Sequence, residues 1–347
     1  MRQSLSRLFR LEPHRQPGHE AGHESGHGAG PARPRYPGLA AVAERIERAP
    51  ALDRPVRFLS DTVVRALPPG SRTDALHGVP FGQPAHPALV WLPLGCWSSG
   101  VLLDFFPSTE RAVVTLLSTG LLSSLPSAAT GLADWSALHR HQQRVGLVHA
   151  ACQLGASALF GASVLVRVSG RHREGKVLSL GGLAVATAGS YLGGHLALRL
   201  GAGASHAEPV AHLAGLGWQD LCALESLPDG RPARRQLGYL SLLALRQGDS
   251  VSVLSDHCTH LGGPLHQGRI TTERGARRPD SLASASGSQR GDGGGIVPPG
   301  DGCVTCPWHG SVFRLADGEV VHGPATARQP SFQSRVNDAG WVQVRVR

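Results

Sequence analysis

The sequence predicts a multidomain protein in which an α-helical transmembrane bundle is followed by an all-β domain. Long stretches rich in Leu, Ala, Val and Gly fill the middle of the chain, as in membrane-spanning helices. Beyond residue 217 the pattern changes to short apolar runs between Gly, Asp and Pro clusters, which indicates strands joined by turns. The predicted regions are a disordered His- and Gly-rich tail (1–50), the helical domain (51–200), a linker (201–216) and the β domain (217–347).

Four apolar stretches of the helical domain are long enough to cross most or all of a ~30 Å hydrocarbon layer at ~1.5 Å per residue. A soluble helical core is the alternative, but helices in such a core keep a polar face, whereas these stretches offer mainly Ser, Thr, Gly and Ala. We therefore expect a multi-pass protein embedded in a lipid bilayer. The predicted spans are residues 88–106, 112–135, 145–168 and 177–200, after an interfacial helix at 51–67.

The formal net charge of +9 at pH 7 suggests an anionic partner, and nucleic acid is one class to consider. A nucleic-acid site needs basic residues on one face with aromatic side chains between them. Here the arginines are scattered through low-complexity segments and helix-flanking loops, and aromatic residues make up only 5% of the chain. Arginines that flank membrane spans explain the charge better, so no nucleic-acid partner is expected.

If the four spans alternate in direction, one ionisable side chain at or near each span lies at the same end of the bundle. Ionisable groups in membranes are unfavourable and usually face the bundle interior, so this set is a candidate metal site, haem site or proton relay. Haem b would use His149 and His195 as its ligands. The alternative, that each histidine lies at headgroup level and bonds to Ser, Thr or backbone, stays open. The four residues are His86, Asp134, His149 and His195.

The β domain contains two short segments that each pair one cysteine with one histidine. Cys258 and His260 lie in the sequence CTHLGGP, and Cys306 and His309 lie in CPWHGSVF. Two thiolates and two imidazoles suit a [2Fe-2S] cluster in which one iron has two cysteine ligands and the other has two histidine ligands. They also suit a structural zinc site with two cysteines and two histidines, and the spacing alone leaves both metals open.

These two loops resemble those of Rieske ferredoxins and of the Rieske domains of oxygenases. The later DG and GPA sequences, at 317–318 and 323–325, extend the resemblance over residues 218–347. The resemblance implies a [2Fe-2S] cluster rather than zinc. The implied ligands are Cys258, His260, Cys306 and His309.

Residues beside these ligands carry further expectations from the resemblance. Ser311 is expected to donate a hydrogen bond toward a bridging sulfide. Cys303 forms a Cys-x-x-Cys pair with Cys306, but the implied ligand set is complete without it, so we expect it to be a bystander. The two loops stand much farther apart than is usual in the family, and a flexible insertion at about 271–300 is expected to fill the interval.

The loops also lack the features of high-potential Rieske proteins. Such proteins carry one extra cysteine in each loop, which together form a cross-link, and a tyrosine whose hydroxyl bonds a ligand sulfur. Gly263 and Trp308 occupy the two cysteine positions, and Phe313 occupies the tyrosine position. Hydrogen bonds to sulfur stabilise the reduced state, so the resemblance implies a midpoint potential toward the lower end of the Rieske range.

The helical domain carries a second resemblance. The sequence GQPAHP at 82–87, together with Asp104 near the end of the first span, is similar to an uncharacterised bacterial four-helix membrane domain that is sometimes fused to Rieske modules. The resemblance covers residues 51–200 and implies no activity. Gln83 stands where that family has a second histidine.

Together these features predict a membrane-attached electron carrier that exchanges single electrons with a redox partner protein, namely a reductase, an oxygenase or a membrane complex. Two alternatives stay open: a membrane oxidoreductase subunit whose bundle binds haem or quinone, and a redox sensor. Little sequence follows His309, so we expect an electron carrier or oxidoreductase component rather than a complete oxygenase. The Arg-rich N-terminal tail has no apolar signal core, which favours the cell membrane with a cytoplasmic Rieske domain.

Overall fold

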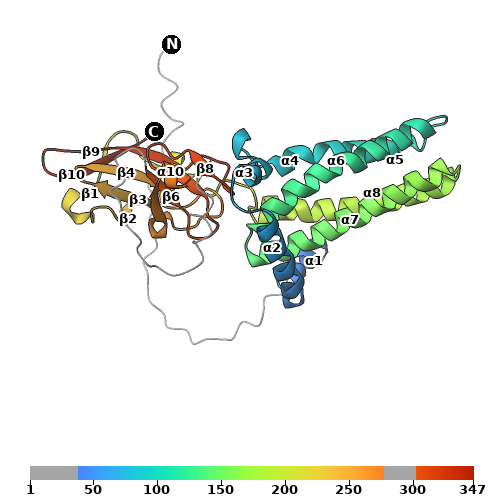
Figure 1. Cartoon of the computed structure of the whole chain (residues 1–347), viewed down its shortest axis with the longest axis horizontal. Coiled ribbons are helices and arrows are strands. Elements are labelled where there is room, and N and C mark those ends of the chain that lie inside the picture. Colours follow the sequence, from blue (N-terminus) through green and yellow to red (C-terminus); the bar gives the residue numbers. More distant parts are fainter. Residues whose placement is uncertain (1–37, 277–301) are drawn as a thin grey trace, which may run out of the picture. The chain divides into compact units, whose positions relative to one another are not determined.

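The computed structural model describes residues 38–276 and 302–347. Residues 1–37 of the predicted disordered tail lie outside these ranges, as does most of the predicted insertion at 271–300. The prediction of disorder was wrong for residues 39–47, which form a helix because Ala43 packs into a core cluster with Val145 and Leu192. Residues 42–347 form one compact unit. The helices in Figure 1 are α1 (Leu39–Glu47), α2 (Asp53–Ala66), α3 (Ser71–His77), α4 (Ala85–Leu89), α5 (Trp91–Leu103), α6 (Glu110–Ser136), α7 (Arg140–Val168), α8 (His172–Gly194), the π-helical turn η3 (His195–Arg199), α9 (Val210–Leu213) and α10 (Glu273–Ala276), with 3-10 turns at Pro50–Leu52, Val79–Phe81, Leu224–Ser226 and Leu265–Gln267.

Three helices in the described part of the chain are long and apolar enough to cross a membrane. They are α6, α7, and α8 continued through η3 to Arg199. Large apolar side chains on these helices remain exposed, including Leu122, Leu154 and Leu165. Such an outward-facing apolar surface is unfavourable in water and matches contact with lipid.

The first predicted span, residues 88–106, is divided between α4 and α5, and α5 is only 13 residues long. Pro93 causes part of this irregularity, because a proline has no N–H to donate to the carbonyl four residues earlier. That carbonyl belongs to Leu89, and the hydroxyl of Ser127 in α6 donates to it instead at 2.9 Å. Three helices in the described part of the chain are thus long enough to cross a membrane, and the four crossings expected from the sequence stay a prediction.

Close packing and one buried ion pair hold the bundle together. The ring of Trp97 in α5 stacks on Phe160 in α7 at 4.6 Å, and a Cβ atom at Gly120 would lie 2.4 Å from the Trp97 ring. Glycine thus allows the two helices to pack closely. In lipid, such close packing stabilises helix association, because the hydrophobic effect does not drive helices together there. At the end of α7, the buried guanidinium of Arg167 pairs with the carboxylate of Asp104, which avoids an isolated charge.

We expect the protein to remain in the membrane pellet after alkaline carbonate extraction, because α6 to α8 would be embedded in lipid. Single cysteines that replace Arg171 and Tyr239, in a background without other reactive cysteines, should then be labelled from opposite sides of sealed vesicles. Arg171 lies between α7 and α8, whereas the exposed Tyr239 belongs to the β domain. Labelling of both positions from the same side would contradict a single crossing by α8.

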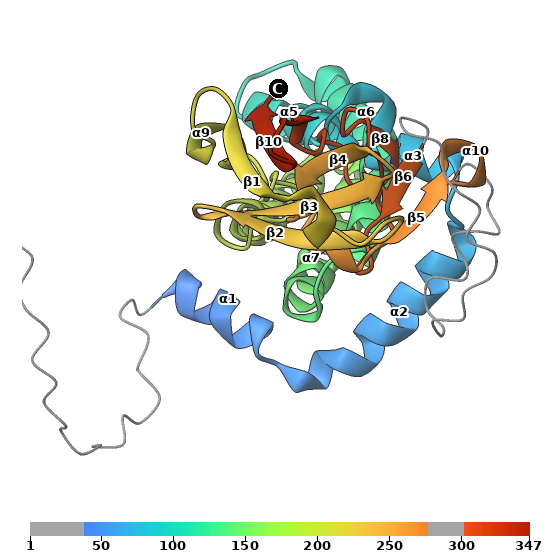
Figure 2. The same ribbon diagram turned by 90° about the vertical axis from the view of Figure 1, so that its left-hand side faces the viewer.

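The β domain contains two antiparallel sheets. The larger sheet has the order β1-β10-β9-β4-β3-β2, and the smaller one has the order β5-β6-β7-β8. Strands β2, β3 and β4 run side by side in Figure 2. The strands are β1 (Gln219–Ala223), β2 (Pro232–Leu237), β3 (Leu240–Gln247), β4 (Ser250–Ser255), β5 (Arg269–Thr272), β6 (Gly302–Thr305), β7 (Val312–Arg314), β8 (Val320–His322), β9 (Ser331–Val336) and β10 (Trp341–Val346).

Strand β3 is buried on both faces, which explains its nearly continuous apolar sequence. Leu243 and Leu245 pack into one cluster with Phe313 of the smaller sheet. Leu242 and Ala244, which alternate with them, pack into a second cluster on the other face. The first of these clusters also contains Cys258 and Cys306, the two cysteines of the predicted ligand set. The two loops that carry the predicted ligands therefore pack directly against the core.

Candidate metal centre

The first predicted ligand loop follows β4 and is closed by two short backbone hydrogen bonds. The N–H of Cys258 donates to the carbonyl of Gly263 at 2.9 Å, and the N–H of Gly262 donates to the carbonyl of Cys258 at 2.8 Å. Gly262 has a φ of 75°, in the left-handed region that favours glycine. The local sequence therefore folds into a tight turn that holds Cys258 at its base.

The second loop, between β6 and β7, repeats this construction. The N–H of Cys306 donates to the carbonyl of Ser311 at 2.8 Å, and the N–H of Gly310 donates to the carbonyl of Cys306 at 3.1 Å. Gly310 also has a left-handed φ, of 76°. In both loops the cysteine carbonyl thus accepts from a left-handed glycine four residues later, so each pair of candidate ligands is presented by the same type of turn.

The four predicted ligands lie together. Cys258 and Cys306 are buried and belong to the same core cluster. The rings of His260 and His309 meet edge to face, with centroids 5.0 Å apart. The Nδ1 atom of His260 is buried and has no hydrogen-bond partner within the described ranges. An orphaned nitrogen of this kind is unfavourable unless a metal or another partner binds it.

The protonation states of these groups also suit a metal. Burial lowers the pKa of His260 and lowers that of His309 to about 4, so both imidazoles are neutral near pH 7. The interaction between the two thiols lowers the pKa of Cys306 to about 7 and raises that of Cys258. Neutral imidazoles and a readily formed thiolate are the states that metals require, so the four residues fit a [2Fe-2S] centre.

Two family comparisons assign the domains. Residues 82–206 match the family described as "Predicted membrane protein (DUF2231)", and residues 217–277 and 287–333 match the family described as "Rieske [2Fe-2S] domain". The C-terminal domain is a Rieske domain. It binds a [2Fe-2S] cluster, and a DUF2231 domain precedes it in the chain.

Among known proteins, the chain is 24% identical over 129 residues to the anthranilate 1,2-dioxygenase ferredoxin subunit of Burkholderia cepacia, covering 37% of this chain and 92% of that protein. It is 22% identical over 116 residues to apoptosis-inducing factor 3 of Mus musculus, covering 33% of this chain but only 14% of that protein. Among solved structures, the ferredoxin of carbazole 1,9a-dioxygenase from Nocardioides aromaticivorans IC177 matches with 18% identity and a TM-score of 0.27, covering 38% of this chain and 98% of that chain.

The two residues predicted beside the ligands both lie in the centre of the Rieske domain. Phe313 is fully buried in the core cluster that contains Cys258 and Cys306. The hydroxyl oxygen of Ser311 accepts the N–H of Ala325 at 3.0 Å, and its own O–H is not used in that bond. Ser311 is therefore held in place by the third loop, between β8 and β9.

Cys303 occupies a different environment from Cys306. It is buried in β6, where it packs with Ala276 and Val312 in a separate apolar cluster. Buried cysteines commonly pack among small apolar residues, and the bystander role of Cys303 stays a prediction.

Gln329 supports the first ligand loop, and no sequence pattern identified it. Its side chain is fully buried. The side-chain amide donates to the carbonyl of Ser255 at 2.9 Å and to the carbonyl of His257 at 2.7 Å. The side-chain oxygen accepts the N–H of Thr259 at 3.0 Å. These bonds fix the backbone on both sides of Cys258. A single Gln in a loop carries no periodic signal, so only the folded structure reveals this role.

Residues outside the Rieske domain contact both ligand loops. His139, which precedes α7, has its ring centroid 5.3 Å from Trp308 and 5.3 Å from His309. The N–H of His206, in the linker, donates to the carbonyl of Thr259 at 2.9 Å. Two segments that precede the Rieske domain in the chain therefore lie against the loops that carry the histidines.

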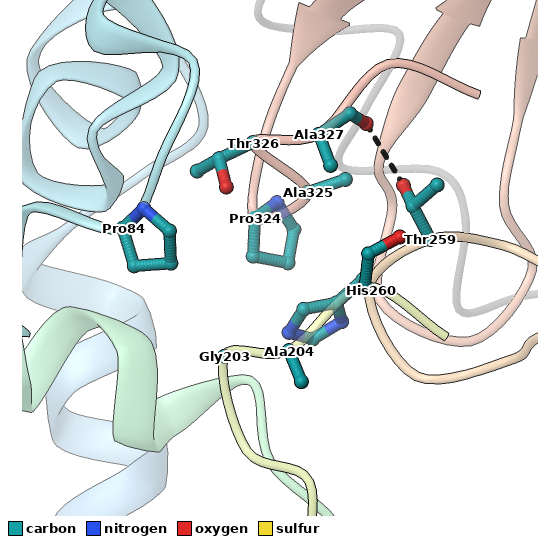
Figure 3. Close-up of a pocket in the computed structure, with 10 residues that line it drawn as sticks. Pro84, Gly203, Ala204, Thr259, His260, Pro324, Ala325, Thr326 and Ala327 are labelled. Carbon is teal, nitrogen blue, oxygen red and sulfur yellow. Dashed lines mark hydrogen bonds between the residues drawn. The ribbon is translucent and has the colours of Figure 1, made fainter. Parts of the chain in front are cut away.

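A small pocket opens beside His260 (Figure 3). Its lining includes Thr259 and Pro324 of the Rieske domain, Gly203 of the linker and Pro84 of the DUF2231 domain. The pocket has a volume of about 30 Å³, which suits a water molecule rather than an organic substrate.

The four ionisable residues predicted at one end of the bundle have different partners. Nδ1 of His86 lies 2.8 Å from the carbonyl of Ser127, and Nδ1 of His149 lies 2.7 Å from the carbonyl of Gly189. Asp134 pairs with His77 at 2.8 Å, and Nε2 of His195 pairs with Glu47 at 2.7 Å. Among the described residues of the bundle, no group of three or more His, Cys, Asp or Glu side chains is arranged to hold a single metal ion.

Proposed function

We propose that Cys258 and Cys306 bind one iron of the cluster and that His260 and His309 bind the other. The observation that supports this assignment is the buried Nδ1 of His260, which has no hydrogen-bond partner among the described residues. The His309 ring lies beside it, and both cysteines are buried in one core cluster. A cluster with this ligand set accepts and donates one electron at a potential above that of all-cysteine clusters. The surrounding residues position the ligands and exclude water.

The same proposal makes the protein a membrane-attached electron carrier. The DUF2231 match and three apolar helices support the attachment. The relatives named as dioxygenase ferredoxins support a redox partner protein of the oxygenase or reductase class. We place the protein in the cell membrane as a multi-pass protein, with the Rieske domain on the cytoplasmic side.

A second candidate is a membrane oxidoreductase subunit in which the bundle takes part in the electron path. The position of His139 against His309 favours it, because in this arrangement the histidine side of the centre faces a helix of the bundle. The carrier and the oxidoreductase subunit share the same cluster and differ in where the electron goes next.

Spectroscopy of the purified protein tests the assignment. Optical and EPR spectra before and after dithionite should show a one-electron Rieske centre, with about two irons and two acid-labile sulfides per chain. One zinc per chain without sulfide would contradict the cluster and restore the zinc alternative.

We further expect a midpoint potential toward the lower end of the roughly −150 to +300 mV Rieske range. Phe313 is buried among the ligand cysteines and offers no hydroxyl to sulfur. A Cβ atom at Gly263 would lie 3.2 Å from the Trp308 ring, so these two positions are adjacent, as a cross-link between the loops would require. Neither position carries a cysteine in this chain.

Phe313→Tyr should raise the midpoint potential, since a new O–H near the ligand sulfur stabilises the reduced state. Phe332→Tyr is the matched control, because Phe332 is buried in the other core cluster of the same domain. Protein-film voltammetry measures both variants. A wild-type potential near the top of the range, or an equal shift in the two variants, would refute the explanation.

A further inference from the structure

Two histidines of the DUF2231 domain are held by the same local arrangement. The ring of His86 in α4 bonds through Nδ1 to the carbonyl of Ser127 in α6. The ring of His149 in α7 bonds through Nδ1 to the carbonyl of Gly189 in α8. In each case a histidine near the start of a helical hairpin is bonded to the later part of the returning helix.

The packing under the two rings is also repeated. A Cβ atom at Gly131, four residues after Ser127, would lie 2.7 Å from the His86 ring. A Cβ atom at Gly193, four residues after Gly189, would lie 3.1 Å from the His149 ring. Both rings therefore rest on a glycine one helical turn beyond the carbonyl that binds them, and any larger residue would displace them.

These contacts determine which nitrogen is available to a ligand. A carbonyl oxygen only accepts hydrogen bonds, so Nδ1 carries the proton in both rings and Nε2 keeps a free lone pair. Across residues 38–276 and 302–347, Nε2 of His86 and Nε2 of His149 make no hydrogen bond to protein. The two rings lie in neighbouring parts of one bundle, because α6, against which His86 packs, contacts α7, which carries His149. Histidines that bind metals have this form, with the second nitrogen bonded to a supporting acceptor.

We infer that His86 and His149 are the two axial ligands of a haem b group bound by the helical bundle. Zinc and similar ions take three or four protein ligands, and the described residues of the bundle offer no cluster of three. Haem iron takes four ligands from its porphyrin and needs only two from the protein, which is the number present. His195, the other candidate from the sequence, has its Nε2 engaged by Glu47. The inference depends only on the bundle and not on the cluster assignment.

Titration of hemin into the full-length protein in detergent tests this site. The wild-type protein should bind about one hemin per chain and give the optical and EPR spectra of a six-coordinate, low-spin haem. His86→Asn and His149→Asn retain an amide N–H for the carbonyl but lack the ligand nitrogen. Each variant should convert the haem to a high-spin form. Each should also weaken hemin binding by roughly 10- to 100-fold or more, because losing a ligand costs at least as much affinity as losing a residue that supports a ligand.

Three controls make the outcome decisive. His195→Asn should keep the low-spin spectrum, and Cys258→Ser should lose the iron–sulfur signal while binding hemin as the wild type does. Unchanged helical circular dichroism and elution volume establish that the histidine variants are folded. The inference is overturned if the wild type binds no hemin, if the His86→Asn, His149→Asn double variant gives the wild-type spectrum, or if His195→Asn loses the low-spin form.

Discussion

Serine in place of Cys258 or Cys306 is expected to abolish the [2Fe-2S] cluster and to destabilise the Rieske domain by at least about 4 kcal/mol. Metal binding contributes directly to the folding of loops that are otherwise held by few contacts. Both cysteines are buried in the core cluster formed with Leu254 and Phe313, so loss of the cluster also disturbs the packing between the sheets. The serine side chain is nearly the same size, so the change isolates the sulfur ligand from any cavity effect.

Cys303→Ser is the matched control for these variants. Cys303 is equally buried but packs in the separate cluster with Ala276 and Val312. Iron and sulfide content, visible circular dichroism and the melting temperature of the β domain should therefore stay close to wild type. Equal loss of iron in all three variants would overturn the ligand assignment.

The ligand loops were predictable because the information that forms them is local. Cys258 and Gly262, like Cys306 and Gly310, lie four residues apart, and the left-handed glycine closes each turn within that interval. The long apolar helices were predictable for a similar reason, since composition over some 20 residues identifies a possible membrane span. Pro93 explains why the first span differs, and its effect on the helix depends on the hydroxyl of Ser127 in another helix.

Contacts between distant segments were not predictable. Gln329 stabilises a loop about 70 residues earlier in the chain, and neither its type nor its spacing indicates this. The sequence placed His86, Asp134, His149 and His195 at one end of the bundle, but it did not show which nitrogens are already bonded. Glu47 and His77, the partners of His195 and Asp134, belong to segments that precede the apolar stretches. Pairing of this kind depends on tertiary packing, which one sequence does not reveal.

Asp74, which precedes the DUF2231 domain in the chain, makes two hydrogen bonds to the Rieske domain. Its carboxylate accepts from Nδ1 of His322 at 2.7 Å and from the N–H of Gly323 at 2.9 Å. The side chains of Asp74 and His322 are both only 13% exposed. The loop that follows leads to Ala325, whose N–H supports Ser311 in the second ligand loop. Asp74 therefore binds the segment that also holds part of the cluster site.

Asp74→Ala is expected to release the Rieske domain, which would remain tethered by its linker. Two donors would lose the acceptor that Asp74 provides, and each donor that stays buried without a partner costs about 1–3 kcal/mol. At ~1.4 kcal/mol per tenfold, a total of at least about 2 kcal/mol should lower the ratio of docked to released domain by about 30-fold or more. The tether keeps the domain near the membrane, so the cluster itself should be retained.

EPR of the reduced cluster in oriented membrane multilayers measures this release. A docked domain holds its cluster at one angle to the membrane, so the wild-type signals should change as the multilayer is rotated in the field. Asp74→Ala should give signals that no longer depend on orientation, whereas Asp61→Ala, at an exposed position of α2, should behave as wild type. If Asp74→Ala keeps the orientation dependence, the carboxylate does not hold the domain. The contact of His139 with His309 would then have to be sufficient for docking.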